Sequence, residues 1–135
     1  MPIRRQDGGI GGSPARRAAT QGILLTDLSA PVLSICIPSY NREALALELL
    51  GELDAPGFLP FDFEVVLVDN ASSTSAYDTV RGFAPQHYPL RYIRLDRTVT
   101  VFENVWGSLR RALGTFCLYM ADDDRLTVGR VPDIE

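Results

Sequence analysis

Three consecutive aspartates, Asp122, Asp123 and Asp124, are the residues of this sequence best suited to chemistry. Adjacent carboxylates raise one another's pKa and cost stability unless a cation compensates their charge. One interpretation is a divalent ion held by one or two carboxylates and completed by water and phosphate oxygens. Ligation by oxygen alone favours Mg²⁺ or Mn²⁺. A solvated acidic loop, or caps for a following helix, is the alternative for an isolated run of this kind.

Two other polar turns follow apolar segments. The side-chain oxygens of Asp69 and Asn70 could accept hydrogen bonds from a base or a ribose, although both residues are also common turn formers. The run Pro38-Ser39-Tyr40-Asn41 either shapes a loop that admits a nucleotide, with Tyr40 lining the pocket, or serves only to cap a helix. His87, between two prolines, is expected at the surface.

The elements that must position these residues begin at about residue 32. Short apolar runs predict strands at 32–37, 64–68, 90–95 and 116–120. The first suits a strand buried on both faces, and the third alternates as an edge or near-edge strand would. Cys36 and Cys117 fall inside apolar runs and are expected to be small buried hydrophobes rather than a redox or metal pair.

Helical patterns separate these strands. Asn41 could cap a helix that runs to about Leu53, and Ser72 or Ser73 could cap a short one. A third helix ends at Gly114, and its predicted core-facing stripe recurs at helical spacing. That stripe consists of Phe102, Val105, Trp106, Leu109 and Leu113.

Strands that alternate with helices at this spacing predict βαβ units, and therefore an α/β fold with a mostly parallel sheet. In such a sheet the carboxyl ends of all strands lie at one edge, where ligands bind. All three polar features follow predicted strands. Their convergence on one edge favours the cation-binding interpretation of the aspartates over a solvated loop.

Composition excludes several classes of function. The chain has 135 residues, enough for one domain, and its formal net charge of −4 argues against nucleic-acid binding. All 13 basic residues are Arg, which excludes chemistry that needs a lysine amine, including that of a phosphoacceptor receiver domain. Residues 1–30 are rich in Gly and Arg and are expected to be a disordered tail. No transmembrane segment is expected, which predicts a cytoplasmic protein, with peripheral contact at the inner face of the cell membrane as an option.

Together, the runs SICIPSYNRE, VVLVDNASS and ALGTFCLYMADDDRL resemble the amino-terminal half of family-2 glycosyltransferases over about residues 32–131. The resemblance implies a Rossmann-like, metal-dependent glycosyltransferase fold with helices on both faces of the sheet, truncated after the DxD-like motif. Ala121 stands where many members carry the first acidic residue, as in the LSDDD-like subset that resembles abequosyl- and rhamnosyltransferases. The segment 95–101 lacks the usual Asn-x-Gly turn.

The resemblance also implies roles for single residues. Asn70 stands where the family usually has an Asp that accepts the uracil imide proton, and Arg97 could reach the diphosphate. Asp123 and Asp124 are expected to bind Mg²⁺ or Mn²⁺. The positions expected to bind the nucleotide are Pro38, Ser39, Tyr40, Asp69, Asn70, Asn104 and Asp122.

The activity implied is inverting, metal-assisted transfer of a sugar from a UDP-, dTDP- or CDP-linked donor to a glycan or lipid-linked acceptor. Residues 31–135 would form the nucleotide-sugar-binding half of the domain, and the catalytic base is expected beyond Glu135. The alternative is a truncated, catalytically silent nucleotide-binding module. The last strand is expected to lack its usual neighbour, which predicts marginal stability or self-association.

Overall fold

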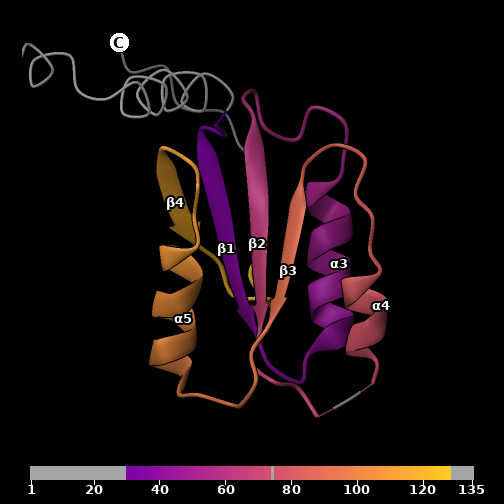
Figure 1. Ribbon diagram of the computed structural model, residues 1–135. Helices are drawn as coiled ribbons and strands as arrows, with labels where there is room; N and C mark the ends of the chain where they lie inside the picture. The colour runs from indigo at the N-terminus through magenta and orange to yellow at the C-terminus, as the bar shows by residue number, and fades with distance from the viewer. Residues whose placement is uncertain (1–29, 74, 129–135) are drawn as a thin grey trace, which may run out of the picture. The chain divides into compact units, whose positions relative to one another are not determined.

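The computed structural model describes residues 30–73 and 75–128. Its centre is a parallel sheet of four strands in the order β3-β2-β1-β4 (Figure 1). The strands are β1 (Leu33–Ser39), β2 (Phe63–Asp69), β3 (Leu90–Arg94) and β4 (Phe116–Tyr119). The predicted parallel α/β architecture is therefore confirmed, as is the edge position of β3. The tail predicted for residues 1–30 lies, apart from Ala30, outside the described residues.

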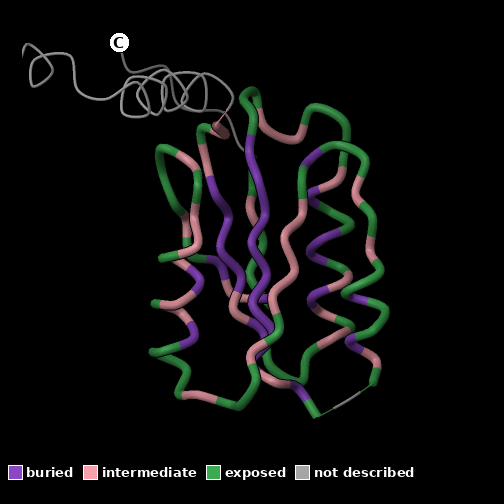
Figure 2. The backbone as a smooth tube through the Cα atoms, in the orientation of Figure 1, coloured by how far each residue is buried: buried purple, intermediate pink, exposed green. Residues whose placement is uncertain are grey.

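Helices cover both faces of the sheet, as predicted (Figure 1). They are α3 (Glu43–Leu53), α4 (Tyr77–Arg81) and α5 (Val101–Arg110). Successive strand residues point to opposite faces, so Ile35 and Ile37 pack in one cluster with the leucines of α3. Cys36 and Val68 belong to a second cluster, against which Leu109 and Ala112 pack. Both central strands are therefore buried on both sides (Figure 2).

The predicted helix caps were wrong. The residue before α3 is Arg42, and Asn41 instead has a φ of 52° and accepts a hydrogen bond from Ser73 N through its side chain at 2.9 Å. The residue before α4 is Ala76, not a serine. Ser72 instead accepts a bond from Asn41 N at 3.0 Å. These polar side chains join the two loops to each other because the parallel sheet brings both strand ends together.

The predicted core face of α5 was also wrong in part. Phe102, Trp106 and Leu113 are 77%, 52% and 63% exposed. The residues of the helix that are buried are Asn104 and Ser108. The helix ends at Arg110, before Gly114. The spacing of the stripe correctly predicted a helix, but periodicity alone does not show which face meets the sheet.

Strand β4 is more exposed than its apolar sequence suggested. It pairs only with β1 among the described strands, and Phe116 and Tyr119 are 65% and 45% exposed. Cys36 is buried as predicted, but the prediction for Cys117 was wrong because this edge strand exposes it. His87 is exposed, as predicted, and lies 3.2 Å from Asp54. Among the described helices, none has the length and apolar character to cross a bilayer.

Candidate functional site

A cavity of about 430 Å³ lies at the carboxyl edge of the sheet. The segments following β1, β2 and β4 contribute to its wall, together with the loop before α5 and the first turn of that helix. Its lining residues are Pro38, Ser39, Tyr40, Arg42, Asn70, Thr98, Val99, Thr100, Val101, Asn104, Tyr119, Ala121 and Asp122. Six of the nine residues predicted to form the site are among them. Asp69, Asp123 and Asp124 are not.

Asp122 is the buried carboxylate of this cavity, with 4% of its surface exposed. Ser39 Oγ donates to its Oδ2 at 2.8 Å, and Tyr77 Oη lies 2.6 Å from the same serine oxygen. Burial raises the pKa of Asp122 above its usual range, and the charge of Asp123 adds to the effect, although Ser39 and Arg42 oppose it. The sequence predicted that neighbouring carboxylates would raise one another's pKa. In the structure Asp122 shows this upward shift, and burial is its largest cause.

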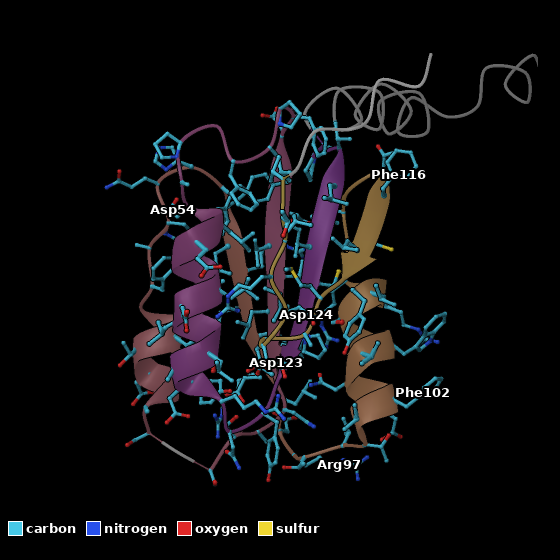
Figure 3. All side chains as sticks on the ribbon, turned by 180° about the vertical axis from the view of Figure 1, so that it is seen from behind. Asp54, Arg97, Phe102, Phe116, Asp123 and Asp124 are labelled. Carbon is cyan, nitrogen blue, oxygen red and sulfur yellow. The ribbon has the colours of Figure 1, made fainter. Side chains whose placement is uncertain are left out.

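Asp123 and Asp124 are exposed and differ in their contacts (Figure 3). Asp123 Oδ2 accepts a hydrogen bond from Arg42 Nη1 at 3.1 Å. Asp124 Oδ2 accepts one from Ala121 N at 3.0 Å, and Asp124 N donates to Ala121 O at the same distance. The Asp124 side chain thus closes the turn that follows β4.

Asp69 lies behind the cavity wall and is fully buried. Its Oδ1 accepts a bond from Ser72 N, and its Oδ2 accepts bonds from Tyr92 Oη and Arg94 Nη1, each at 2.6 Å. Burial raises the pKa of Asp69, but the hydrogen bonds from Ser72 and Tyr92 and the charge of Arg94 outweigh it, so that the pKa is lower than usual. Both oxygens of the Asp69 carboxylate are thus hydrogen-bonded within the fold.

Asn70 does line the cavity, with its amide already paired on both sides. Asn70 Nδ2 donates to Val99 O at 2.9 Å, and Asn70 Oδ1 accepts from Val99 N at 2.8 Å. These reciprocal bonds hold the loop before α5 against the end of β2. The oxygen expected to accept a base proton is therefore engaged by the protein's own backbone.

Asn104 is the described residue whose polar group most clearly lacks a partner. It is 4% exposed, and its Oδ1 is the one buried side-chain oxygen of the described residues without a hydrogen bond. Its Nδ2 lies 3.5 Å from Val68 O, at the limit of a hydrogen bond. A buried unpaired acceptor costs free energy. Because Asn104 lines the cavity, its oxygen is suited to a ligand that donates a hydrogen bond.

A divalent ion fits this edge only in part. Within the described residues, no group of three or more His, Cys, Asp or Glu side chains could hold a metal. Two carboxylates nevertheless face one cation, because Arg42 Nη1 lies 3.5 Å from Asp122 Oδ1 and 3.1 Å from Asp123 Oδ2. Mg²⁺ is commonly held by one or two carboxylates together with water and phosphate. Asp122 and Asp123 are suited to that arrangement.

The sequence did not indicate every residue of the cavity. Arg42 is 81 positions from Asp123, and Tyr119 belongs to a strand that had been expected to be buried. The loop at 98–100 carried no recognised motif. The sequence predicted that Arg97 could reach the diphosphate. In the structure Arg97 is exposed and is not among the residues that line the cavity (Figure 3). Only tertiary proximity reveals this part of the site.

Comparison with known proteins matches residues 34–134 to the family described as Glycosyl transferase family 2. Abequosyltransferase RfbV of Salmonella typhimurium is 28% identical over 96 residues, 70% of this chain and 29% of the relative. A PGL/p-HBAD biosynthesis glycosyltransferase of Mycobacterium tuberculosis is 31% identical over 99 residues, 73% of this chain and 38% of the relative. Validoxylamine A glucosyltransferase of Streptomyces hygroscopicus is 45% identical over 53 residues, 39% of this chain and 12% of the relative.

Solved structures of similar fold include a mannosyltransferase and a protein crystallised with a nucleotide sugar. Residues 1–349 of S. aureus TarS match with a TM-score of 0.59 and 29% identity, over 68% of this chain and 27% of that one. The same fragment has been crystallised with UDP-GlcNAc. Mannosyltransferase PcManGT from Pyrobaculum calidifontis, in complex with GDP-Man and Mn²⁺, matches with a TM-score of 0.57 and 26% identity, over 70% of this chain and 28% of that one. The chain thus spans well under half the length of each of these proteins.

Proposed function

Because the chain belongs to glycosyl transferase family 2, we propose that it provides the nucleotide-sugar-binding part of a transferase that moves a sugar from a nucleotide-diphosphate donor to an acceptor hydroxyl. The observation that carries this proposal is the cavity at the carboxyl edge of the sheet. It combines a buried carboxylate, Asp122, with an unpaired buried acceptor, Asn104 Oδ1. Ligands of open α/β folds bind at this edge.

In this proposal, each wall of the cavity has its own task. Tyr40, half exposed, would lie against the base or ribose, and Asn104 Oδ1 would accept a hydrogen bond from a hydroxyl or amide of the donor. Asn70 would shape the loop at 98–100 rather than contact the base. Its Oδ1 and Nδ2 each form one hydrogen bond with Val99, so its bonds to the loop are the role we assign to it.

Asp122 and Asp123 would hold Mg²⁺ or Mn²⁺, which would neutralise the charge that develops on the departing diphosphate. The reaction we propose is a single displacement at the anomeric carbon with inversion. Ser39 would keep Asp122 oriented through its bond to Oδ2, leaving Oδ1 to face the ion. We assign the catalytic base to no described residue. To Asp124, expected from the sequence to bind the metal, we assign a supporting role instead, because its carboxylate closes the turn that carries the other two.

For the donor we propose a UDP-, dTDP- or CDP-linked sugar, and for the acceptor a glycan or lipid-linked hydroxyl. Structures of TarS contain UDP or UDP-GlcNAc, and that of PcManGT contains GDP-Man. GDP therefore belongs in any test of the base. The abequosyltransferase relative supports an abequosyl group as one candidate for the transferred sugar.

Calorimetric titration tests this function. UDP, dTDP, CDP and GDP are each titrated into the chain with and without Mn²⁺. We expect one or more of them to bind more tightly with the metal, and Asp123→Asn to remove that enhancement. Asp78→Asn, which changes the charge equally on exposed Asp78 of α4, is the matched control. Metal-independent binding, or equal loss in both variants, would overturn the proposed role of the metal.

A silent nucleotide-binding module is the second candidate function. The roles proposed above are compatible with it, because each of them binds the donor or the metal and none removes the acceptor proton. This candidate predicts binding without turnover. Release of radiolabelled sugar from a bound donor by the 135-residue chain would decide against it.

A further inference from the structure

Arg42 places a positive charge where the proposed metal would lie. One nitrogen, Nη1, lies 3.1 Å from Asp123 Oδ2 and 3.5 Å from Asp122 Oδ1. The second cation near the triplet, Arg125, is directed elsewhere, because its guanidinium pairs with Glu48 and Glu52 of α3 at 3.1 Å each. Arg42 is therefore the described cation that compensates the two carboxylates.

The backbone of Arg42 is anchored, whereas its side chain is open to solvent. Arg42 N donates to Tyr77 Oη at 2.9 Å, and that oxygen lies 2.6 Å from Ser39 Oγ, which in turn donates to Asp122. The Arg42 side chain is 53% exposed. The guanidinium can thus leave the carboxylates by rotation about its side-chain bonds, without any change in the loop that carries it.

A divalent ion and this guanidinium cannot occupy the position together. Mg²⁺ binds carboxylate oxygens at about 2.0–2.1 Å, and an ion shared by Asp122 Oδ1 and Asp123 Oδ2 would fill the space between them that Nη1 now takes. Two positive charges only a few ångströms apart would also repel. Any ion that uses both oxygens must displace Arg42.

We propose that Arg42 is an internal counter-ion that competes with the divalent metal for Asp122 and Asp123 and, once displaced, binds the diphosphate of the donor. This inference rests on the proposed function and assigns to it a residue that the sequence had not indicated. Arg42 lines the same cavity, so its freed guanidinium remains beside the ligand. Guanidinium groups bind phosphate oxygens through paired hydrogen bonds. Metal binding and donor binding are thereby coupled through one side chain.

The test measures Mn²⁺ affinity by electron paramagnetic resonance in the absence of nucleotide. Arg42→Gln removes the charge and keeps most of the bulk, so it should bind Mn²⁺ more tightly, on the order of fivefold, as the loss of one or two half-exposed ion pairs implies. Arg42→Lys keeps the charge and should remain near the parent. With saturating Mn²⁺, Arg42→Gln should bind UDP on the order of threefold more weakly.

The matched control is Arg110→Gln. Arg110 lies over the Trp106 ring in the last turn of α5, the end of the helix opposite the cavity, and its loss changes the net charge equally. It should leave both affinities unchanged. A shift of the Arg42 Nε–Hε resonance on addition of diamagnetic Mg²⁺, absent when the same buffer is added without the ion, gives a readout independent of affinity.

The outcomes separate this inference from the proposed function. Mn²⁺ affinity that is unchanged or lowered in Arg42→Gln, while the parent chain still binds UDP with Mn²⁺, overturns the competition alone. Unchanged UDP affinity in that variant overturns the transfer of Arg42 to the diphosphate. If neither the parent chain nor any variant binds Mn²⁺, both the inference and the proposed metal site fail. Tighter metal binding in Arg42→Gln, with Arg110→Gln unaffected, supports the inference.

Discussion

Asn70 shows how one side chain can decide the shape of a cavity wall. An amide both donates and accepts, so it satisfies Val99 N and Val99 O together. An aspartate at this position could accept from Val99 N but would face the Val99 carbonyl with a second acceptor. The departure from the family's usual Asp therefore matches a backbone contact that only an amide completes.

We expect Asn70→Asp and Asn70→Ala to destabilise the chain by about 1–3 kcal/mol each, because a buried carbonyl, and in Ala also an N–H, loses its partner. Hydrogen exchange separates them. The Val99 amide should exchange faster in Asn70→Ala but stay protected in Asn70→Asp, which can still accept its bond. Equal protection of Val99 in Asn70→Ala and the parent would contradict this role. Urea unfolding supplies the stability values.

At the scale of elements, Glu64 joins three parts of the fold. This β2 residue is 3% exposed. Its carboxylate accepts hydrogen bonds from Ser34 Oγ of β1 at 2.6 Å, from Arg91 of β3 at 3.0 and 3.1 Å, and from Leu113 N at 2.9 Å. The connection from α5 to β4 is thereby tied to the sheet. Burial by itself would raise the pKa of Glu64. These hydrogen bonds outweigh that effect, so the pKa of Glu64 is lower than usual.

Unfolding free energy should therefore depend on pH through Glu64. A carboxylate whose pKa is lower in the folded chain adds stability above its unfolded pKa of about 4.5, and this contribution disappears as pH falls through the folded pKa. The parent chain should lose stability below about pH 4.5. Glu64→Gln should cost about 1–3 kcal/mol at pH 7, and this difference should shrink towards pH 3.

Urea unfolding at pH 7, 5, 4 and 3 measures this dependence. Glu48→Gln is the control, since Glu48 forms an exposed ion pair with Arg125 and should cost less than about 0.5 kcal/mol. A difference between parent and Glu64→Gln that stays constant over this range would show that ionised Glu64 does not stabilise the fold.

Gly114 lies in the connection from α5 to β4, where the structure leaves no room for a side chain. A Cβ at this position would lie 2.8 Å from Ser34 N, closer than real contacts allow, whereas a Cβ at Gly51 would meet nothing within 4 Å. Gly51 lies within α3, where alanine favours the helix. We expect Gly114→Ala to lower the melting temperature by several degrees or more, and Gly51→Ala to leave it unchanged or raise it slightly. A matched pair of thermal melts measures both, and equal effects would exclude this explanation.

At the scale of the whole described fold, the flank formed by α5 and β4 is apolar and exposed. Phe102 and Phe116 lie at opposite ends of this flank (Figure 3), and the half-exposed Trp106 and Tyr119 belong to the same two elements. Exposed apolar side chains grouped on one flank are typical of an association surface. Among the described strands, β4 pairs on one side only, and an open strand edge favours edge-to-edge association.

We therefore expect the chain in isolation to self-associate, as the unpaired edge predicted for the last strand had already suggested. Light scattering should give a mass that rises with concentration. Phe102→Glu combined with Phe116→Glu should shift the mass towards the monomer, because a carboxylate is costly to bury at an interface. Phe61→Glu, which changes a 41% exposed residue outside this flank, is the control. A concentration-independent monomer with a sharp two-state melt would contradict the expectation.

The order of strands and helices, the parallel sheet and the family could be predicted from the sequence. Each depends on local patterns: apolar runs such as 64–68, helical spacing near α5 and three motifs in a fixed order. Because parallel strands end at one edge, the position of the site near Ser39, Asn70 and Asp122 also followed. These are properties of neighbours in the chain and of one general rule of topology.

Tertiary structure alone decided which groups meet. Local periodicity does not show that α5 presents Ser108 to the sheet and Trp106 to solvent, because that depends on which strands lie beneath the helix. Nor does it show that β4 is an edge strand. The contacts of Arg42 with the aspartates and of Asn70 with Val99 join residues 81 and 29 positions apart. Sequence patterns report the conformation of neighbouring residues, whereas pairing between distant side chains exists only once the sheet has brought them together.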